Sequence, residues 1–140
     1  MYWKAREDSF IYSIKTPELT KRITKRLILS EIAKLFDPLG LLGPVILYAK
    51  LIMQDLWQSK VTWDESVPSS IHYKWIHFCS RLELINDITI SRNVSLNQVK
   101  GTELHGFCDA SEKGYGACLY VRTDSGVGNF DVLFYAPSPV

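Results

Sequence analysis

The hydrophobic positions of this 140-residue chain change their spacing twice. Near the amino end they alternate, with Phe10, Tyr12 and Ile14 at every second position, which is the period of a strand with one buried face. A polar stretch, KARED, separates this run from the aromatic Trp3. The pattern predicts an N-terminal β-hairpin within residues 1–20.

From about residue 21 to residue 95 the apolar spacing becomes helical. A first helix is expected to end at the Asp37-Pro38 pair, because proline cannot continue a helix. Its broad apolar face carries Ile28, Ile32 and Leu35, with Leu29, Ala33 and Phe36 beside them. The apolar segment 39–43 that follows is expected to pack as a loop against its neighbours.

Two further helices are predicted in the same region. The second spans about residues 44–60. It has a narrow polar stripe and is apolar almost everywhere else, so most of its surface is expected to be buried. That stripe consists of Lys50, Gln54 and Gln58. The third begins at Pro68, and its apolar positions recur on one helix face: Ile71, Trp75, Phe78, Leu82 and Ile85.

The period changes again at about residue 96. Three short strands are predicted at Leu104–Cys108, Ala117–Val121 and Val132–Tyr135, joined by connections rich in turn residues. Three consecutive strands on short connections form an antiparallel meander, which must bury one face to be stable. The chain is therefore expected to be an α+β protein with an N-terminal β-hairpin, a three-helix middle segment and a C-terminal antiparallel three-stranded meander.

Composition and charge restrict the function only weakly. The net charge is +1 and 46% of the residues are hydrophobic, as in ordinary globular domains. Lysine and arginine exceed the acids by four in residues 1–60, whereas the acids exceed them by three in residues 61–140. This asymmetry fits phosphate contact in the first part of the chain and cation contact in the second.

No segment predicts secretion or membrane insertion. The amino end is charged from its fourth residue, unlike a secretory leader. The longest apolar run, Leu39–Ala49, is shorter than the roughly 20 residues of a spanning helix. The three cysteines are odd in number and widely spaced, which is typical of reduced thiols. We expect an intracellular location, cytoplasmic or nuclear, and no membrane partner.

The stretch ELHGFCDASEKGYGACLYVR at 103–122 carries the strongest candidate chemistry. It predicts a strand that ends in Asp109, a tight glycine-rich turn and a returning strand. A carboxylate at a strand end suits a divalent metal ion, although Mg²⁺ commonly uses more than one carboxylate. The alternative is that Asp109 only begins a turn. Nothing in the pattern assigns Glu112 or Asp131 as further ligands.

A basic cluster opens the first helix and comprises Lys21, Arg22, Lys25 and Arg26. Their i, i+4 spacing places two adjacent basic rows on one side of a helix, where they could contact nucleic-acid phosphates. The Ser111 hydroxyl, beside the glycine-rich turn, could approach a nucleic-acid backbone in the same way. The alternatives are a solvated helix end and glycines that serve only the turn.

Three segments together carry a resemblance to a known family: TKRLILSEIAKLFDPLGLLGP at 24–44, WDE at 63–65, and FCDAS with GYGACLY at 107–120. In this order they resemble the Pao retrotransposon family of BEL/Pao elements. The resemblance extends over residues 1–135, which is nearly the whole chain.

The resemblance implies three parts of a retrotransposon polyprotein. Residues 1–20 would end the reverse-transcriptase palm, residues 21–95 would form a helical thumb- or connection-like region, and residues 96–140 would be the truncated start of an RNase H-like domain. In RNase H-like enzymes an Asp at the end of the first strand binds Mg²⁺, so Asp109 would supply one carboxylate of an incomplete metal site.

The resemblance also implies partners. The intact polyprotein would bind Mg²⁺ and grip an RNA–DNA hybrid or template–primer, and this chain would contact both the nucleic acid and the remainder of the polyprotein. Alone it is expected to bind no metal tightly and to be neither a polymerase nor a nuclease.

Two other function classes remain open. The chain could be a non-catalytic protein-interaction module or domesticated remnant, with its apolar FDPLGLLGP segment packed on a partner. It could also be an aspartic peptidase through Asp124, which begins the tripeptide DSG, although the polar glycine-rich surroundings favour a turn. His72, His77 and Cys79 have no recognisable zinc spacing.

Overall fold

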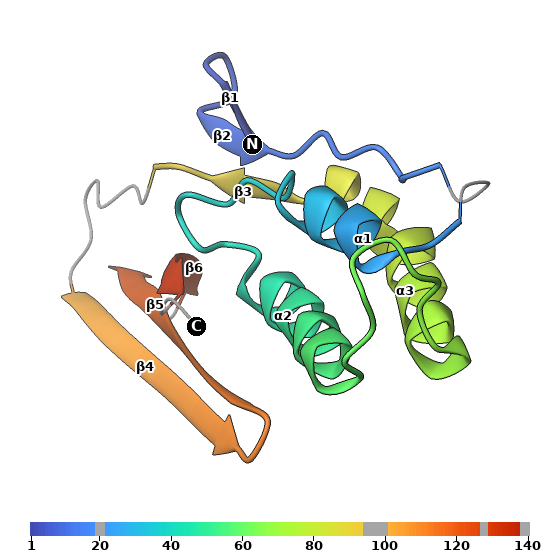
Figure 1. The fold of residues 1–140 in the computed structure, drawn as a ribbon. Helices are drawn as coiled ribbons and strands as arrows, with labels where there is room; N and C mark the ends of the chain where they lie inside the picture. Colours follow the sequence, from blue (N-terminus) through green and yellow to red (C-terminus); the bar gives the residue numbers. More distant parts are fainter. Residues whose placement is uncertain (19–21, 94–100, 127–128, 138–140) are drawn as a thin grey trace.

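The computed structural model describes residues 1–18, 22–93, 101–126 and 129–137. A group of helices lies beside two three-stranded antiparallel sheets, so the α+β prediction is confirmed (Figure 1). The elements follow the chain in the order β1 (Tyr2–Lys4), β2 (Ser9–Ile11), α1 (Lys25–Ile32), α2 (Gly43–Gln58), α3 (Ser69–Leu82), the 3₁₀ helix η1 (Glu83–Asp87), β3 (Thr89–Ser91), β4 (Gly101–Ser111), β5 (Gly114–Gly126) and β6 (Asn129–Pro137).

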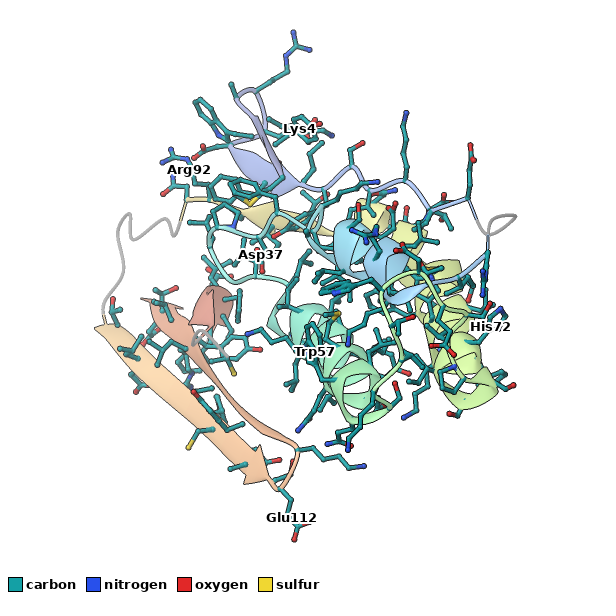
Figure 2. All side chains as sticks on the ribbon, viewed as in Figure 1. Lys4, Asp37, Trp57, His72, Arg92 and Glu112 are labelled. Carbon is teal, nitrogen blue, oxygen red and sulfur yellow. The ribbon has the colours of Figure 1, made fainter. Side chains whose placement is uncertain are left out.

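The main hydrophobic core lies among the three α-helices (Figure 2). The apolar series predicted for the third helix is confirmed, because all five of its side chains are buried. Ile28 of α1 and Ile52 and Leu56 of α2 complete the centre of this core. The sequence overestimates the burial of α2, since Tyr48 and Trp57 on its surface are 40% and 51% exposed.

Helix α1 is shorter than predicted. It begins after Thr24, whose side-chain oxygen accepts a hydrogen bond from the Leu27 amide at 3.2 Å, as an N-cap does. It ends at Ile32 rather than at Asp37. The next turn tightens instead, because the amides of Lys34 and Leu35 bond to carbonyls three residues back.

Asp37 organises the loop between α1 and α2. Its carboxylate accepts hydrogen bonds from the Leu41 amide at 3.0 Å and the Leu42 amide at 2.7 Å, directly before α2 begins. Gly40 completes the reversal with a φ of 71°, which favours glycine. Leu42 is 3% exposed, whereas Leu39 is 48% exposed, so only part of this loop packs as predicted.

The N-terminal hairpin gains a third strand that the sequence analysis did not predict. Strand β3 pairs antiparallel with β2, so that the chain beyond α3 returns to its amino end. Arg92 fixes this return through two hydrogen bonds to the carboxylate of Asp8. The side-chain amide of Asn86 adds to it, bonding both the amide and the carbonyl of Ile14 at 2.7 and 2.9 Å.

The C-terminal sheet has the order β4-β5-β6 and confirms the predicted meander. Its strands are longer than predicted, and β4 pairs with β5 from Gly101 opposite Asp124 to Ser111 opposite Gly114. The sheet meets the helices near its hairpin end. A Cβ on Gly114 would lie 2.9 Å from Cδ1 of Leu47, so the missing side chain lets β5 approach α2 closely.

The longest described helix, α2, has 16 residues. Among the helices in the described ranges, none is long and apolar enough to cross a lipid bilayer.

Candidate functional site

Asp109 lies within strand β4, opposite Gly116 of β5. The strand continues to Ser111, so the prediction that it ends at Asp109 is wrong by two residues. The predicted glycine-rich turn is also wrong, because the hairpin turns through Glu112 and Lys113 and both nearby glycines lie inside β5. The Asp109 side chain is exposed, and its Oδ1 accepts a hydrogen bond from the Ala110 amide at 2.9 Å.

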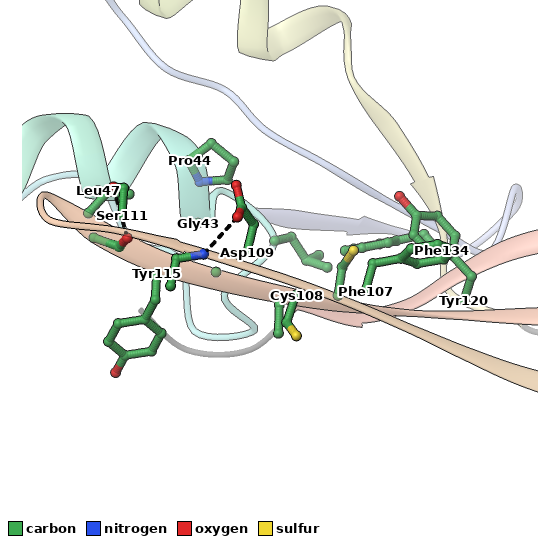
Figure 3. Close-up of a pocket in the computed structure, with 16 residues that line it drawn as sticks. Gly43, Pro44, Leu47, Phe107, Cys108, Asp109, Ser111, Tyr115, Tyr120 and Phe134 are labelled. Carbon is green, nitrogen blue, oxygen red and sulfur yellow. Dashed lines mark hydrogen bonds between the residues drawn. The ribbon is translucent and has the colours of Figure 1, made fainter.

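A cavity of about 640 Å³ lies between the start of α2 and the β4–β5 hairpin. Asp109 lines it and points toward Gly43 and Pro44, as Figure 3 shows. Away from Asp109 the wall is mostly apolar and includes Phe107, Tyr120 and Phe134. Asp109 is therefore a lone carboxylate that faces the first turn of a helix across an apolar hollow.

Asp109 contributes one carboxylate to this cavity. Mg²⁺ needs near-octahedral oxygen coordination and is usually bound through one or two carboxylates together with waters and substrate oxygens. Within residues 1–18, 22–93, 101–126 and 129–137, no group of three or more His, Cys, Asp or Glu side chains could hold a metal ion. Among the residues that line the cavity, Asp109 is the one carboxylate.

The Ser111 hydroxyl is engaged in the hairpin turn. Its Oγ donates to the Gly114 carbonyl at 3.2 Å and accepts a hydrogen bond from the Lys113 amide, also at 3.2 Å. Ser111 therefore stabilises the tip of the hairpin. Its contact with a nucleic-acid backbone stays a prediction.

The basic cluster does not form two rows on a helix. Lys21 lies outside the described residues, and Arg22 precedes α1, whose first residue is Lys25. The Arg22 Nε donates to Ser66 Oγ at 2.6 Å. Arg26 makes two hydrogen bonds to Asp64, at 2.8 and 3.0 Å, and this bond lowers the pKa of the Asp64 carboxyl.

Lys25 is buried, with 5% of its surface exposed. Its Nζ lies 3.6 Å from the ring centroid of Trp57 and 5.4 Å from that of Trp63. A cation held over aromatic faces in this way is stabilised by the negative face of each ring. The expectation that Lys25 is a surface cation is therefore wrong, and its charge fastens the start of α1 to α2 and to the loop after it.

The comparison with known families agrees with this architecture. The Pao retrotransposon-like RNaseH-like domain family matches residues 24–137, which is most of the chain. The chain belongs to this family. The match confirms the resemblance on residues 24–44, 63–65 and 107–120 and extends through both the helices and the meander. Neither a curated protein nor a solved structure matches the chain significantly.

In this RNase H-like domain a second polar group lies on the same face of the sheet as Asp109. Glu103 Oε2 bonds to His105 Nε2 at 3.0 Å and accepts from Arg122 Nη1 at 2.8 Å, and these contacts lower the pKa of the Glu103 carboxyl. Arg122 also lies over the ring of Phe130, 3.7 Å from its centroid. This group was not predicted from the sequence, although the i, i+2 spacing of Glu103 and His105 places both side chains on one face of a strand and would have indicated it.

Asp124 of the RNase H-like domain lies in a paired strand. It is opposite Gly101 on one side and Phe130 on the other, and the DSG tripeptide forms the end of β5. The interpretation of this tripeptide as a link between strands is therefore wrong. Cys79, which has no recognisable zinc spacing with His72 and His77, is buried in the helical core. Burial raises the pKa of its thiol to about 12.

Proposed function

We propose that the chain is a region of a retrotransposon polyprotein that links the reverse transcriptase to RNase H, contacts an RNA–DNA hybrid, and has no nuclease activity alone. The family match carries the retroelement part of this proposal. Within the described ranges, no group of three or more His, Cys, Asp or Glu side chains could hold a metal ion, and this supports the proposed absence of independent activity.

Asp109 would act as one carboxylate of a metal site whose other ligands come from elsewhere in the polyprotein. Three features support this role: the side chain is exposed, it lines a cavity, and it accepts a hydrogen bond from the neighbouring amide of Ala110 through one oxygen. Its oxygens therefore keep lone pairs available for a cation.

The metal part is tested by NMR on the 140-residue chain. Adding Mg²⁺ should shift amide signals near Asp109 weakly, without saturation at millimolar concentration, since a single carboxylate makes a poor site. Asp109→Asn should abolish these shifts, whereas Asp131→Asn on β6 should keep them. Shifts centred on another segment would contradict the role of Asp109.

A nuclease assay tests the proposed absence of nuclease activity in the isolated chain. With Mg²⁺ and an RNA–DNA hybrid, the chain should release no product. Cleavage that disappears in Asp109→Asn would mean that a complete catalytic set exists within this chain, and the proposal would be wrong.

Hybrid contact is tested by fluorescence anisotropy with a labelled RNA–DNA duplex. Binding should weaken steeply with salt, because phosphate contacts release counterions. Replacing Lys21 and Arg22 by Gln should reduce the salt slope by about one per contact. Lys74→Gln on α3, whose ammonium pairs with Asp55 at 2.6 Å, is the matched control and should leave the slope unchanged. Binding that does not depend on salt, or no binding, would contradict the proposal.

The alternative function, a protein-interaction module, is favoured by a different observation. Apolar side chains on β4 are strongly exposed, with Leu104 at 62% and Phe107 at 59%. A chain that binds no hybrid but associates with protein would support this alternative. Peptidase activity through Asp124 has no such support, because Asp124 lies in a paired strand.

A further inference from the structure

A second hollow lies between helices α2 and α3, and we call it the α2–α3 groove. The two helices lie side by side (Figure 1), and Tyr48 of α2 stacks on Phe78 of α3 with ring centroids 5.8 Å apart and an interplanar angle of 26°. The groove has a volume of about 270 Å³, and the apolar part of its wall includes Val45, Leu82 and Ile85. The helical part of the chain therefore has a cavity in addition to the one beside the C-terminal sheet.

Two planar side chains line the groove and are each supported by another ring. Tyr48 has one face on Phe78 and is 40% exposed. His77 is half-buried and stacks on Tyr73, with ring centroids 6.3 Å apart and an interplanar angle of 23°. A ring that is held from one side has a fixed orientation and keeps its other face for a further stacked ring. The groove therefore suits a flat aromatic group.

One cation lies beside these rings. Arg81 is the one Asp, Glu, Lys or Arg side chain among the described residues that line the groove. It is exposed, and it lies four residues after His77, which places both side chains on the same face of α3. A guanidinium group binds a phosphate through paired N–H donors. A flat apolar slot next to a single cation is complementary to a nucleobase that is joined to a phosphate.

The groove adjoins the cavity at Asp109. Pro44, in the first turn of α2, lines both hollows. A nucleic-acid strand at Asp109 would therefore reach the groove by crossing the start of α2. The groove is slightly smaller than the roughly 300–1,000 Å³ of sites that hold drug-sized molecules, so its size suits a single base. A base in a duplex is stacked and paired, so only an unpaired base enters without disrupting the duplex.

We propose that the α2–α3 groove binds one unpaired nucleotide, whose base stacks on Tyr48 and His77 and whose phosphate pairs with Arg81. This inference rests on the proposed contact with nucleic acid, and it assigns a place to the strand where it leaves the paired hybrid. Stacking on aromatic side chains does not depend on the identity of the base, so the groove accepts any of them.

Fluorescence anisotropy of the 140-residue chain tests the groove with a blunt RNA–DNA hybrid, the same hybrid with a single-stranded extension, and the single strand alone. The extension is about eight nucleotides long, within the roughly 4–16 nucleotides that small single-strand-binding folds cover. The extended hybrid should bind about tenfold more tightly than the blunt one, which is the effect of one base–aromatic stack.

Three variants identify the residues responsible. Tyr48→Leu keeps an apolar contact with Phe78 and should remove the gain from the extension, whereas Tyr48→Phe keeps the ring and should retain it. Arg81→Gln should lower the salt slope for the single strand by about 0.7, the value for one phosphate contact. Arg6→Gln, an exposed position in the turn between β1 and β2, is the matched control and should leave both quantities unchanged.

The blunt hybrid separates this proposal from the proposed function. Binding of the blunt hybrid with no gain from the extension, or a gain that survives in Tyr48→Leu, would overturn the groove and leave the hybrid contact intact. Binding of the single strand that depends on Tyr48, without binding of the blunt hybrid, would support the groove and contradict the hybrid contact.

Photocrosslinking tests the same contact in the wild-type chain, so that its result does not depend on the folding of a variant. An iodouracil in the extension should crosslink to Tyr48 or His77 under near-ultraviolet light, because it reacts with a ring on which it stacks. Tyr2 of β1, which is 61% exposed, is the control ring and should stay unlabelled. Equal labelling of Tyr2 and Tyr48 would overturn the proposal.

Discussion

The hydroxyl of Tyr12 donates a 3.0 Å hydrogen bond to Oδ1 of Asp37, 25 residues further along the chain. Tyr12 is 3% exposed. The carboxylate of Asp37 also accepts hydrogen bonds from the backbone amides of Leu41 and Leu42. One carboxylate therefore joins the N-terminal segment to the loop that starts α2. Since α2 forms one wall of the cavity at Asp109, this bond also positions the candidate site.

Removing this hydrogen bond should lower the stability of the fold, and the loss should be larger when Asp37 is replaced than when Tyr12 is replaced. Tyr12→Phe should lower the free energy of unfolding by about 1 kcal/mol, the usual net value of a hydrogen bond. Asp37→Ala should cost about 2–3 kcal/mol, because it also leaves two backbone amides without their acceptor. Urea denaturation of both single variants and the double variant gives the coupling free energy between Tyr12 and Asp37. Additive losses would show that the two residues do not interact.

Alkaline pH should weaken the fold through Tyr12. Burial first, and then the hydrogen bond to Asp37, raises the pKa of Tyr12 above its ordinary value of 10.0. The unfolded chain therefore loses this proton at lower pH than the folded chain, so the contribution is complete below pH 10 and is lost as the pH rises above it. The melting temperature of wild type should fall more steeply above pH 10 than that of Tyr12→Phe. Parallel curves would contradict the assignment.

Gly114 should tolerate a side chain less well than Gly116. A Cβ at position 114 meets Leu47 Cδ1 at 2.9 Å, whereas a Cβ at position 116 has nothing within 4 Å. Gly114→Val should destabilise by about 1–2 kcal/mol, the usual cost of overpacking, and Gly116→Val should not. Adding Leu47→Ala should relieve part of the loss in Gly114→Val. Thermal unfolding of the three variants and the wild type measures this, and equal stabilities at 114 and 116 would be inconsistent with the contact.

The three cysteines should react at very different rates. Burial raises the pKa of the Cys79 thiol to about 12, so almost none is thiolate at pH 8, while Cys108 is exposed. Iodoacetamide at pH 8 should modify Cys108 first and leave Cys79 unmodified until the chain unfolds. Mass spectrometry of the peptides reads this out, with urea-unfolded protein as the control in which all three react. Early modification of Cys79 would mean that the helical core opens.

The sequence predicts most of the secondary structure because its apolar periods are clear. The five-residue apolar series predicted for the third helix is buried as expected, four of its residues in α3 and Ile85 in η1, and the meander forms where the period changes to two. Strand β3 was not predicted, since three residues, Thr89–Ser91, are too few for a period to be recognised. Its existence depends on pairing with β2, which is distant in sequence.

The candidate site was predictable in its residue but not in its surroundings. Asp109 stood out because of its neighbours in the sequence and the family resemblance. The cavity that Asp109 faces is lined on its other side by Gly43 and Pro44, about 65 positions before Asp109 in the sequence. No local sequence pattern predicts that these residues meet. Lys25 illustrates the same limit, since its charge reads as a surface feature until two tryptophans are seen to enclose it.

The sequence by itself determined the fold class, the helical faces and the family, because these depend on local period and on motif order. The tertiary structure alone decided which charges are available and what Asp109 faces. Those properties arise when distant segments remove one another's surface from water, and a linear pattern contains no information on which segments meet.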